Sequence, residues 1–380
     1  MTIRFLGVGA KSSIFAAVKS ERQKNQRMSQ TGKKKVLVTG ASGFIGSFMV
    51  SDGLDRGYEM WAGMRRSSSK QYLTDGRIKF AELDLGNPNR LREQLLGYKS
   101  EMGGGWDYVI HAAGATKSLK REGFFRTNTD GTRNLVNALR DCDMMPQRFV
   151  FVSSLSIFGA IKEEKTGTDG SLLRYFPITD KDTPRPNTAY GESKLAAENF
   201  LRSQTDVPWV ILRPTGVYGP REKDYFLMAQ SIKQHVDFAV GYQPQEITFV
   251  YMMDVVQAAF LACERPEADV LHHAYFLSDG HSYNSRAFSD LLQKEMGTRL
   301  VLHIKAPLWF LHAVCAVNGT VCRWMGKLTT LNMDKYHILA QRNWNCDIEP
   351  ARRELGYKPQ WNLEEGVRAS VKWYKEAGWL

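Results

Sequence analysis

Cysteine is scarce in this sequence, and its spacing excludes two kinds of protein. The 380 residues contain five cysteines: Cys142, Cys263, Cys315, Cys322 and Cys346. Their number is odd, they lie far apart, and they lack the CxxC or His-paired spacing of a zinc site or a disulfide framework. We therefore expect buried free thiols, no metal site, and a protein of a reducing compartment, the cytoplasm.

Long hydrophobic runs are also missing. The stretch from Ala306 to Cys322 has seventeen residues without Lys, Arg, Asp or Glu, slightly short of the roughly 20 residues that a membrane span needs. His312 and Asn318 within it would need polar partners in lipid. We expect a core or substrate-facing helix here, and this interpretation is favoured over membrane contact.

Acidic residues are almost absent from the N-terminal end. Residues 1–35 contain nine Lys or Arg and one acid, Glu21, so they hold +8 of the formal net charge of +11 and leave +3 for the rest. Because the body of the chain is nearly neutral, a nucleic-acid partner is not expected. Residues 1–34 are interpreted as a basic, disordered extension outside the fold.

From Lys35 onward, short β-branched runs alternate with helical stretches, which predicts an α/β fold with a doubly wound parallel sheet. The six clearest strands are Lys35–Thr39, Glu59–Met64, Ile78–Glu82, Tyr108–His111, Arg148–Ser153 and Trp209–Arg213. A further strand and helix, Ile247–Ala262, are expected to return to this domain. We therefore assign residues 35–213 with 247–262 to a dinucleotide-binding Rossmann domain, and residues 214–246 with 263–380 to a smaller substrate-binding cap.

Three glycines mark the turn after the first strand. Gly40 permits the tight turn, Gly43 lets the backbone approach a pyrophosphate, and Gly46 lets the following helix lie close to the sheet. The position of this triplet, between a strand and a helix at the start of the α/β pattern, makes it a specific signal for a dinucleotide. The expected cofactor contacts in the turn are Gly40, Ser42, Gly43, Phe44, Ile45 and Gly46.

The second strand ends without the acid that usually holds the ribose hydroxyls of NAD. The expected position is near Met64, and Arg65 and Arg66 follow it. Since an arginine can clamp a 2′-phosphate, NADP is the preferred cofactor and NAD the alternative. Further cofactor contacts are expected after the third and fourth strands, at Asp84, Leu85, Ala112 and Ala113.

A tyrosine and a lysine four residues apart form the predicted proton-transfer site. Tyr190 and Lys194 lie on one face of a predicted helix. A phenol with a pKa near 10 is a poor base, but an adjacent ammonium and a positive nicotinamide would stabilise its phenolate. Ser154, at the end of the fifth strand, is the candidate donor to the reacting oxygen, with Ser153 and Ser156 as competitors.

Several further motifs occur in the same order as in a known family. They are Asn128–Asn134 (NTDGTRN), Leu212–Pro220 (LRPTGVYGP) and Phe249–Val256 (FVYMMDVV). With the glycine turn and the Tyr190 motif, they make the chain resemble the extended short-chain dehydrogenase/reductases from Lys35 onward. The resemblance implies hydride transfer with Ser154, Tyr190 and Lys194 in catalytic roles, a nicotinamide pocket lined by Pro214 and Val217, and a homodimer.

Two observations narrow the choice of reaction within this family. Dehydratases of nucleotide sugars carry an acid pair directly after the catalytic hydroxyl, whereas this chain has Leu155 and Ser156, which cannot perform that elimination. The ending Asn345–Tyr374 resembles the 3β-hydroxysteroid and sterol dehydrogenases as well as epimerase-like members. With the apolar run Ala306–Leu311, this favours a dehydrogenase of a hydrophobic secondary alcohol over a nucleotide-sugar epimerase, and a non-catalytic dinucleotide sensor is a third reading.

Overall fold

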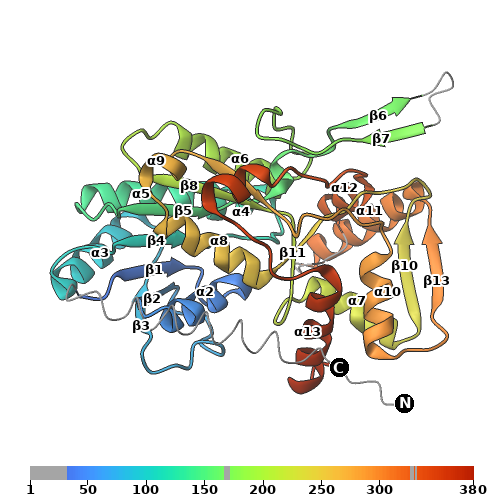
Figure 1. Ribbon diagram of the computed structural model, residues 1–380, viewed down its shortest axis with the longest axis horizontal. Coiled ribbons are helices and arrows are strands. Elements are labelled where there is room, and N and C mark those ends of the chain that lie inside the picture. Colours follow the sequence, from blue (N-terminus) through green and yellow to red (C-terminus); the bar gives the residue numbers. More distant parts are fainter. Residues whose placement is uncertain (1–31, 167–171, 326–328, 330–331) are drawn as a thin grey trace, which may run out of the picture.

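A computed structural model describes residues 32–166, 172–325, 329 and 332–380. Almost all of the predicted basic extension, 1–34, lies outside the described residues. A seven-stranded sheet lies at the centre of the larger part of the molecule (Figure 1). Its strand order is β12-β8-β5-β4-β1-β2-β3, and every neighbouring pair is parallel. The strands are β1 (Lys35–Thr39), β2 (Glu59–Met64), β3 (Lys79–Glu82), β4 (Tyr108–His111), β5 (Arg148–Val152), β8 (Trp209–Pro214) and β12 (Ala274–Leu277).

Both faces of the sheet are buried, because alternate residues of its central strands enter different cores. In β1, Val36 and Val38 belong to one core and Leu37 to the other. One core is closed by α2 (Phe44–Asp55) and α8 (Met252–Glu264), which pack on each other. The opposite core is closed by α3 (Pro88–Met102), α5 (Gly131–Asp141) and α6 (Ala189–Arg202). The near-continuous apolar strands follow from this double burial.

The doubly wound parallel sheet predicted from the sequence is confirmed, and the six predicted strands are present within one residue at each end. The seventh strand, β12, is a correction. The sequence predicts residues 274–277 in the cap, but they pair with β8 at the edge of the sheet. Their sequence, AYFL, has no β-branched residue and lies in the irregular part of the chain beyond Pro214, so its strand signal is weaker than that of the equally short β4. The rest of the predicted domain division stays a prediction.

The segment Ile247–Ala262, which is predicted to return to the sheet domain, forms a strand and a helix that pack in different places. The helix, α8, packs against β5 and β8. The strand, β11 (Phe249–Tyr251), pairs instead with β9 (Gly216–Tyr218) in a separate two-stranded sheet. This small sheet leads from the large sheet into the cap.

The cap lies at one end of the large sheet, to the right in Figure 1. It contains β10 (Val236–Val240) paired with β13 (Leu302–Ala306). Its helices among the described residues include α7 (Asp224–Lys233), α10 (Ala287–Met296), α11 (Leu308–Trp324), α12 (Met333–Ala340) and α13 (Leu363–Glu376). A core around Tyr218, Phe288 and Tyr374 joins α7, α10 and α13. A hairpin, β6 (Glu163–Thr166) with β7 (Leu172–Tyr175), projects from the body.

In the part of the chain that the structure describes, no helix combines the length and the apolarity needed to cross a bilayer. The stretch around Ala306–Cys322 forms the end of β13 and most of α11. Of the five cysteines, Cys322 is half-buried and the others are buried.

Candidate active site

The glycine turn joins β1 to α2, and two of its glycines have no space for a side chain. Gly40 has a φ of +68°, and a Cβ on it would lie 2.7 Å from the Cα of Ala113. A Cβ on Gly46 would lie 2.3 Å from the carbonyl oxygen of Gly40. The Gly43 N–H donates to the same oxygen at 2.9 Å. Glycine is therefore required at Gly40 by both conformation and contact, and at Gly46 by contact.

The N-terminus of α2 is open to an anion. Its N-cap residue is Gly43, and among the described residues no side chain caps the helix and no acid lies in its first turn. Ser42, Phe44 and Ile45 complete the turn. Unsatisfied N–H groups and the helix dipole favour a phosphate at such a position. The residues present therefore fit the pyrophosphate of a dinucleotide.

Residues that follow neighbouring strands surround this turn. Ala112 and Ala113 follow β4 and lie against Gly40. Asp84 and Leu85 follow β3, and the Leu85 carbonyl accepts a hydrogen bond from Asn134 Nδ2 at 2.8 Å. Arg65 follows β2 and is exposed. All lie at the carboxyl edge of the sheet, where the strand order reverses between β1 and β4, which is where such sheets bind dinucleotides. Their contact with a cofactor stays a prediction.

A buried hydrogen-bond chain fixes the junction of β1 and β4. The Ala113 N–H donates to Thr39 Oγ1 at 3.3 Å, and this hydroxyl bonds His111 Nδ1 at 2.6 Å. On the other side of the ring, His111 Nε2 lies 3.0 Å from Thr132 Oγ1, which donates to the Asn128 carbonyl. Burial, with a smaller contribution from Lys194, lowers the pKa of His111 to about 3. The imidazole is therefore neutral and structural at physiological pH.

Tyr190 lies in the first turn of α6, which confirms the helix predicted for this segment. The helix begins there because Thr188 caps it, accepting from the Gly191 N–H at 3.0 Å. The Ser154 hydroxyl donates to Ser156 Oγ at 3.0 Å and lies close to the Tyr190 phenol. Burial raises the pKa of Tyr190, and the nearby Ser154 hydroxyl lowers it by a smaller amount. The structure thus brings together two of the three predicted catalytic side chains.

Lys194 lies one turn further along α6 and is buried. Its Nζ donates to the Val152 carbonyl at 2.8 Å and lies 4.7 Å from the centre of the Phe151 ring. Burial lowers the pKa of Lys194 to about 8, partly offset by Glu198. A Cβ on Gly114 would lie 3.2 Å from Nζ, so the ammonium faces the loop after β4. In this position its charge lies between the end of β5 and the loop that follows β4.

Asn128 is a site residue to which the sequence analysis gave no role. Its side chain is buried, accepts from the Ala115 N–H at 2.7 Å, and donates to the Ala115 carbonyl and to Ser193 Oγ at 3.1 and 2.9 Å. It lies in a π-helical segment, η1 (Phe125–Asp130), a distortion often found at functional sites. The place of Asn128 in the NTDGTRN motif is the sequence signal that could have indicated this role. Asn128 positions the loop beside Lys194.

The two residues predicted to line the nicotinamide pocket lie where β8 leaves the sheet. Pro214 is the last residue of β8 and is buried. Val217 lies in β9, is half-buried, and pairs with Val250 of β11. These positions are at the carboxyl edge of the sheet, so they are compatible with the predicted contact, which stays a prediction.

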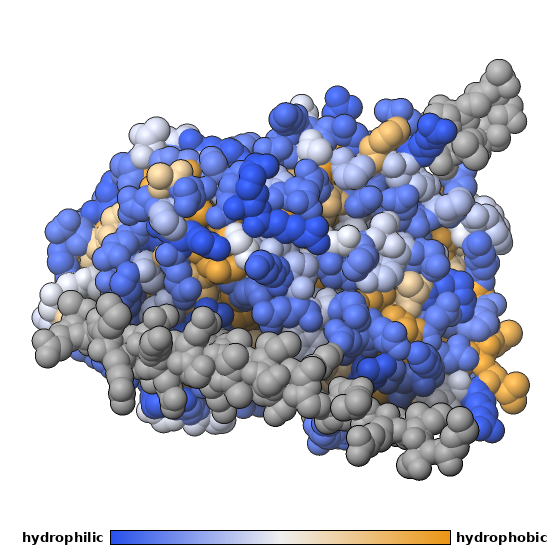
Figure 2. All heavy atoms as spheres, in the orientation of Figure 1, coloured by the Kyte–Doolittle hydropathy of each residue, from blue (hydrophilic) through white to orange (hydrophobic). Residues whose placement is uncertain are grey.

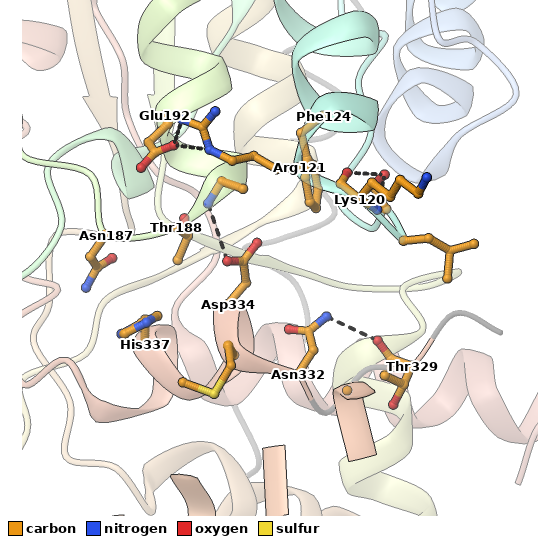
Figure 3. Close-up of a pocket in the computed structure, with 15 residues that line it drawn as sticks. Lys120, Arg121, Phe124, Asn187, Thr188, Glu192, Thr329, Asn332, Asp334 and His337 are labelled. Carbon is orange, nitrogen blue, oxygen red and sulfur yellow. Dashed lines mark hydrogen bonds and ion pairs between the residues drawn. The ribbon is translucent and has the colours of Figure 1, made fainter. Parts of the chain in front are cut away.

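A cavity of about 340 Å³ lies beside the start of α6 (Figure 3). Thr188, Ala189 and Glu192 of this segment line it, whereas Tyr190 does not. The cavity lies between the start of α6, the segment around α4 (Arg121–Phe124), and helices α11 and α12 of the cap. The ring of Phe124 lines the cavity and contacts that of Tyr190, with centroids 6.4 Å apart. Asp334 accepts a hydrogen bond from the Ala189 N–H at 3.4 Å, so its carboxylate lies at the N-terminus of α6. The cavity is the candidate substrate site.

Comparison with known families identifies the chain. Residues 36–277 match the model of the NAD dependent epimerase/dehydratase family. The chain belongs to this family. It is accordingly an enzyme of the extended short-chain dehydrogenase/reductase type, as the sequence motifs predict. The matched segment ends at the last residue of β12, which agrees with the placement of that strand in the sheet.

Curated relatives within this family differ in the reaction that their names state. A 3-beta-hydroxysteroid dehydrogenase of Mycolicibacterium neoaurum is 25% identical, over 91% of this chain and 93% of its own length. A ceramide reductase of Caulobacter vibrioides is 24% identical, over 93% and 98%. A UDP-glucose 4-epimerase of Vibrio cholerae is 26% identical, over 90% and 96%. At these identities the relatives leave the substrate of this chain open.

Solved structures of other enzymes share the fold. The dTDP-glucose 4,6-dehydratase DesIV of Streptomyces venezuelae, with NAD and TYD bound, has a TM-score of 0.70 at 21% identity, covering 91% of this chain and 98% of its own. The enzyme WbmG of Bordetella bronchiseptica, in complex with NAD, has a TM-score of 0.69 at 19% identity, covering 92% and 97%.

Proposed function

We propose that this enzyme is an NAD(P)-dependent dehydrogenase that transfers a hydride between nicotinamide and an uncharged, hydrophobic secondary alcohol or ketone of steroid-like character. The bound nicotinamide would supply the hydride acceptor and a positive charge. In oxidation, Tyr190 would take the hydroxyl proton of the substrate, and Ser154 would hydrogen-bond the same oxygen. Lys194 would hold its ammonium near the developing phenolate and favour it.

The charge of the cavity is the observation that carries this proposal. The charged side chains that line it are Lys120, Arg121, Glu192 and Asp334, two cations and two acids. Arg121 is bonded to Glu192 (Figure 3), so its charge is balanced within the cavity, and Lys120 is the other lining cation. A nucleotide sugar carries a diphosphate, which normally requires unpaired cations or helix N-termini. Of the helix N-termini that border the cavity, that of α6 is occupied by the Asp334 carboxylate, and that of α12 is capped by Asn332.

The residues after Ser154 support a simple redox reaction. Leu155 is buried in a 3-10 turn and Ser156 donates its N–H to Ser154 Oγ at 3.1 Å. Neither side chain can act as the general acid or base that eliminates water. The relatives named for steroid and ceramide substrates are consistent with a lipid-like substrate.

Epimerisation of a nucleotide sugar is the second candidate. It is favoured by the UDP-glucose 4-epimerase relative, whose identity to this chain is as high as that of the steroid dehydrogenase. An epimerase uses the same three side chains with a cofactor that stays bound. It would require the cavity to accept a diphosphate despite Asp334 and the paired Arg121.

The test is to incubate the enzyme with NAD or NADP and follow the absorbance of the reduced cofactor. Steroid alcohols serve as one substrate set, and UDP-glucose with product analysis as the other. Net reduction of the cofactor by steroid alcohols supports the dehydrogenase. Interconversion of sugars without net reduction would replace it by the epimerase.

NADP is proposed as the preferred cofactor because Met64 and Arg65 stand where an acid would select NAD. We predict that Arg65→Ala weakens NADPH binding by about 1–3 kcal/mol, since it removes one charge-assisted contact to the 2′-phosphate. NADH binding should not change. Titration of cofactor fluorescence measures both, with Arg92→Ala, an exposed arginine on α3, as the control. Equal effects on both cofactors would contradict the preference.

A further inference from the structure

Exposed apolar side chains gather on one part of the cap. They lie on β10, on β13 and on the outer side of α11. Orange side chains protrude from the edge of the molecule formed by β10 and β13 (Figure 2). Scattered exposed apolar residues are ordinary, but a continuous group marks a surface that contacts something other than water.

The strand part of this surface is a two-stranded sheet with an apolar outer face. Leu302 and Ile304 alternate along β13 and are both exposed, and Phe238 of β10 pairs with Ile304 and is exposed beside it. Leu300, just before β13, is 93% exposed. The exposed ring of Tyr242 adds to this surface near the end of β13, just before α11 begins. Its hydroxyl donates to the Lys305 carbonyl at 3.3 Å.

The helix part is apolar on both sides. Leu311, Cys315 and Gly319, four residues apart, face inward, and Gly319 lines the substrate cavity. The opposite side exposes Trp309 and Trp324, at 73% and 88%. A helix on a water-exposed surface normally has a polar outer side. Here an indole stands near each end of a helix, roughly 22 Å apart at 1.5 Å per residue, and Trp is the residue that favours the boundary between lipid and water.

The charge of this segment is of one sign. Residues 297–325 contain no Asp or Glu, and their charged residues are Arg299, Lys305 and Arg323. Arg299 and Lys305 are exposed, and Lys305 lies over the Tyr242 ring. Apolar residues bordered by cations complement a surface of anionic headgroups. A second copy fits less well, since a two-fold axis through this surface would bring its cations together.

We propose that the lipid-facing surface, formed by Phe238, Leu300, Leu302, Ile304, Trp309 and Trp324, docks the enzyme on an anionic membrane. The chain lies on the lipid and does not cross it, in keeping with the length of α11. The same helix then separates the lipid from the substrate cavity. This docking does not depend on which substrate the cavity takes.

Flotation with lipid vesicles tests the proposal. The full chain is mixed with vesicles of phosphatidylcholine alone or with added phosphatidylglycerol. We expect it to float with the anionic vesicles, less with the neutral ones, and less as salt is raised. Trp324→Ser and Leu302→Ser should each lower the partition coefficient, Trp324→Ser by at least about tenfold. Leu96→Ser, an exposed leucine on α3, is the matched control and should float like the wild type.

Two readouts separate docking from other causes. Arg299→Gln with Lys305→Gln should remove the preference for anionic vesicles, and the melting temperature of every variant should match the wild type. Wild-type protein that stays with neither vesicle would overturn the proposal. So would a dimer in solution that Trp324→Ser separates, with no flotation, because the surface would then contact a second copy. Cofactor reduction with dispersed substrate should be equal in all variants. Because flotation is measured without substrate, it tests the docking even if the proposed reaction proves wrong.

Discussion

A buried ion pair lies beneath the catalytic hydroxyls. Arg213 of β8 donates to Glu198 of α6 at 3.1 and 2.6 Å, and Ser153 donates to the same carboxylate at 2.6 Å. All three side chains are buried. Ser153 precedes Ser154, and Glu198 lies one turn after Lys194, so this group ties the two catalytic elements to β8.

We predict that Arg213→Ala lowers the free energy of unfolding by about 3–5 kcal/mol, because it leaves the Glu198 carboxylate buried without its close partner. Arg202 is the control, since its guanidinium is exposed and 3.8 Å from Glu198. Arg202→Ala should cost less than about 1 kcal/mol. Denaturant unfolding measures both. Similar losses in the two variants would contradict the account.

At the residue scale, the sequence predicted which side chains meet but not what each contacts. Tyr190 and Ser154 were predictable because their motifs stand at known places in an α/β pattern. The contact of Lys194 Nζ with the Val152 carbonyl depends on how α6 packs on β5, which spacing alone does not specify. The roles of Asn128 and Asp334 depend on loops and cap helices meeting the sheet, so local sequence could not reveal them.

At the element scale, two helical glycines can be compared: Gly46 at the start of α2 and Gly97 inside α3. We predict that Gly46→Ala destabilises the protein by at least about 1–3 kcal/mol and abolishes cofactor binding, because its Cβ would collide with the Gly40 carbonyl. Gly97, inside α3, has nothing within 4 Å of its Cβ position. Gly97→Ala should therefore stabilise by about 0.5–1 kcal/mol. Melting temperatures with and without cofactor test both predictions.

Asp254 connects α8 to the segment before α13. Its carboxylate accepts from the N–H groups of Gln360 and Trp361 at 2.9 and 3.2 Å. Burial raises the pKa of Asp254 to about 7; the two bonds lower it and Asp279 raises it further.

Because the folded pKa lies above the unfolded value near 3.9, the proton binds the folded state more tightly. Its stabilising contribution is complete below about pH 4 and is lost as the pH rises through 7. We predict that Asp254→Asn, compared with the wild type by urea unfolding between pH 4 and 7, shows a flatter dependence on pH. An unchanged slope would contradict the raised pKa.

At the scale of the whole molecule, the periodic part of the fold was predictable and the cap was not. Strands buried on both faces and glycine turns have strong local signatures, so the sheet could be derived from β1 to β8. β12 lacked such a signature. The run in α11 was expected to face a core or a substrate, and Gly319 does line the cavity. The exposure of its outer side could not be predicted, because the sequence of an apolar helix does not indicate which of its sides other elements cover.

The central claim is that Tyr190 moves the proton in a hydride-transfer reaction above the glycine turn. The most direct measurement compares Tyr190→Phe with the wild type, using cofactor absorbance for turnover and fluorescence titration for cofactor binding. We predict that turnover falls by at least about a hundredfold, while the affinity for the cofactor is retained. A variant that keeps most of its turnover, with the cofactor bound, would contradict the claim.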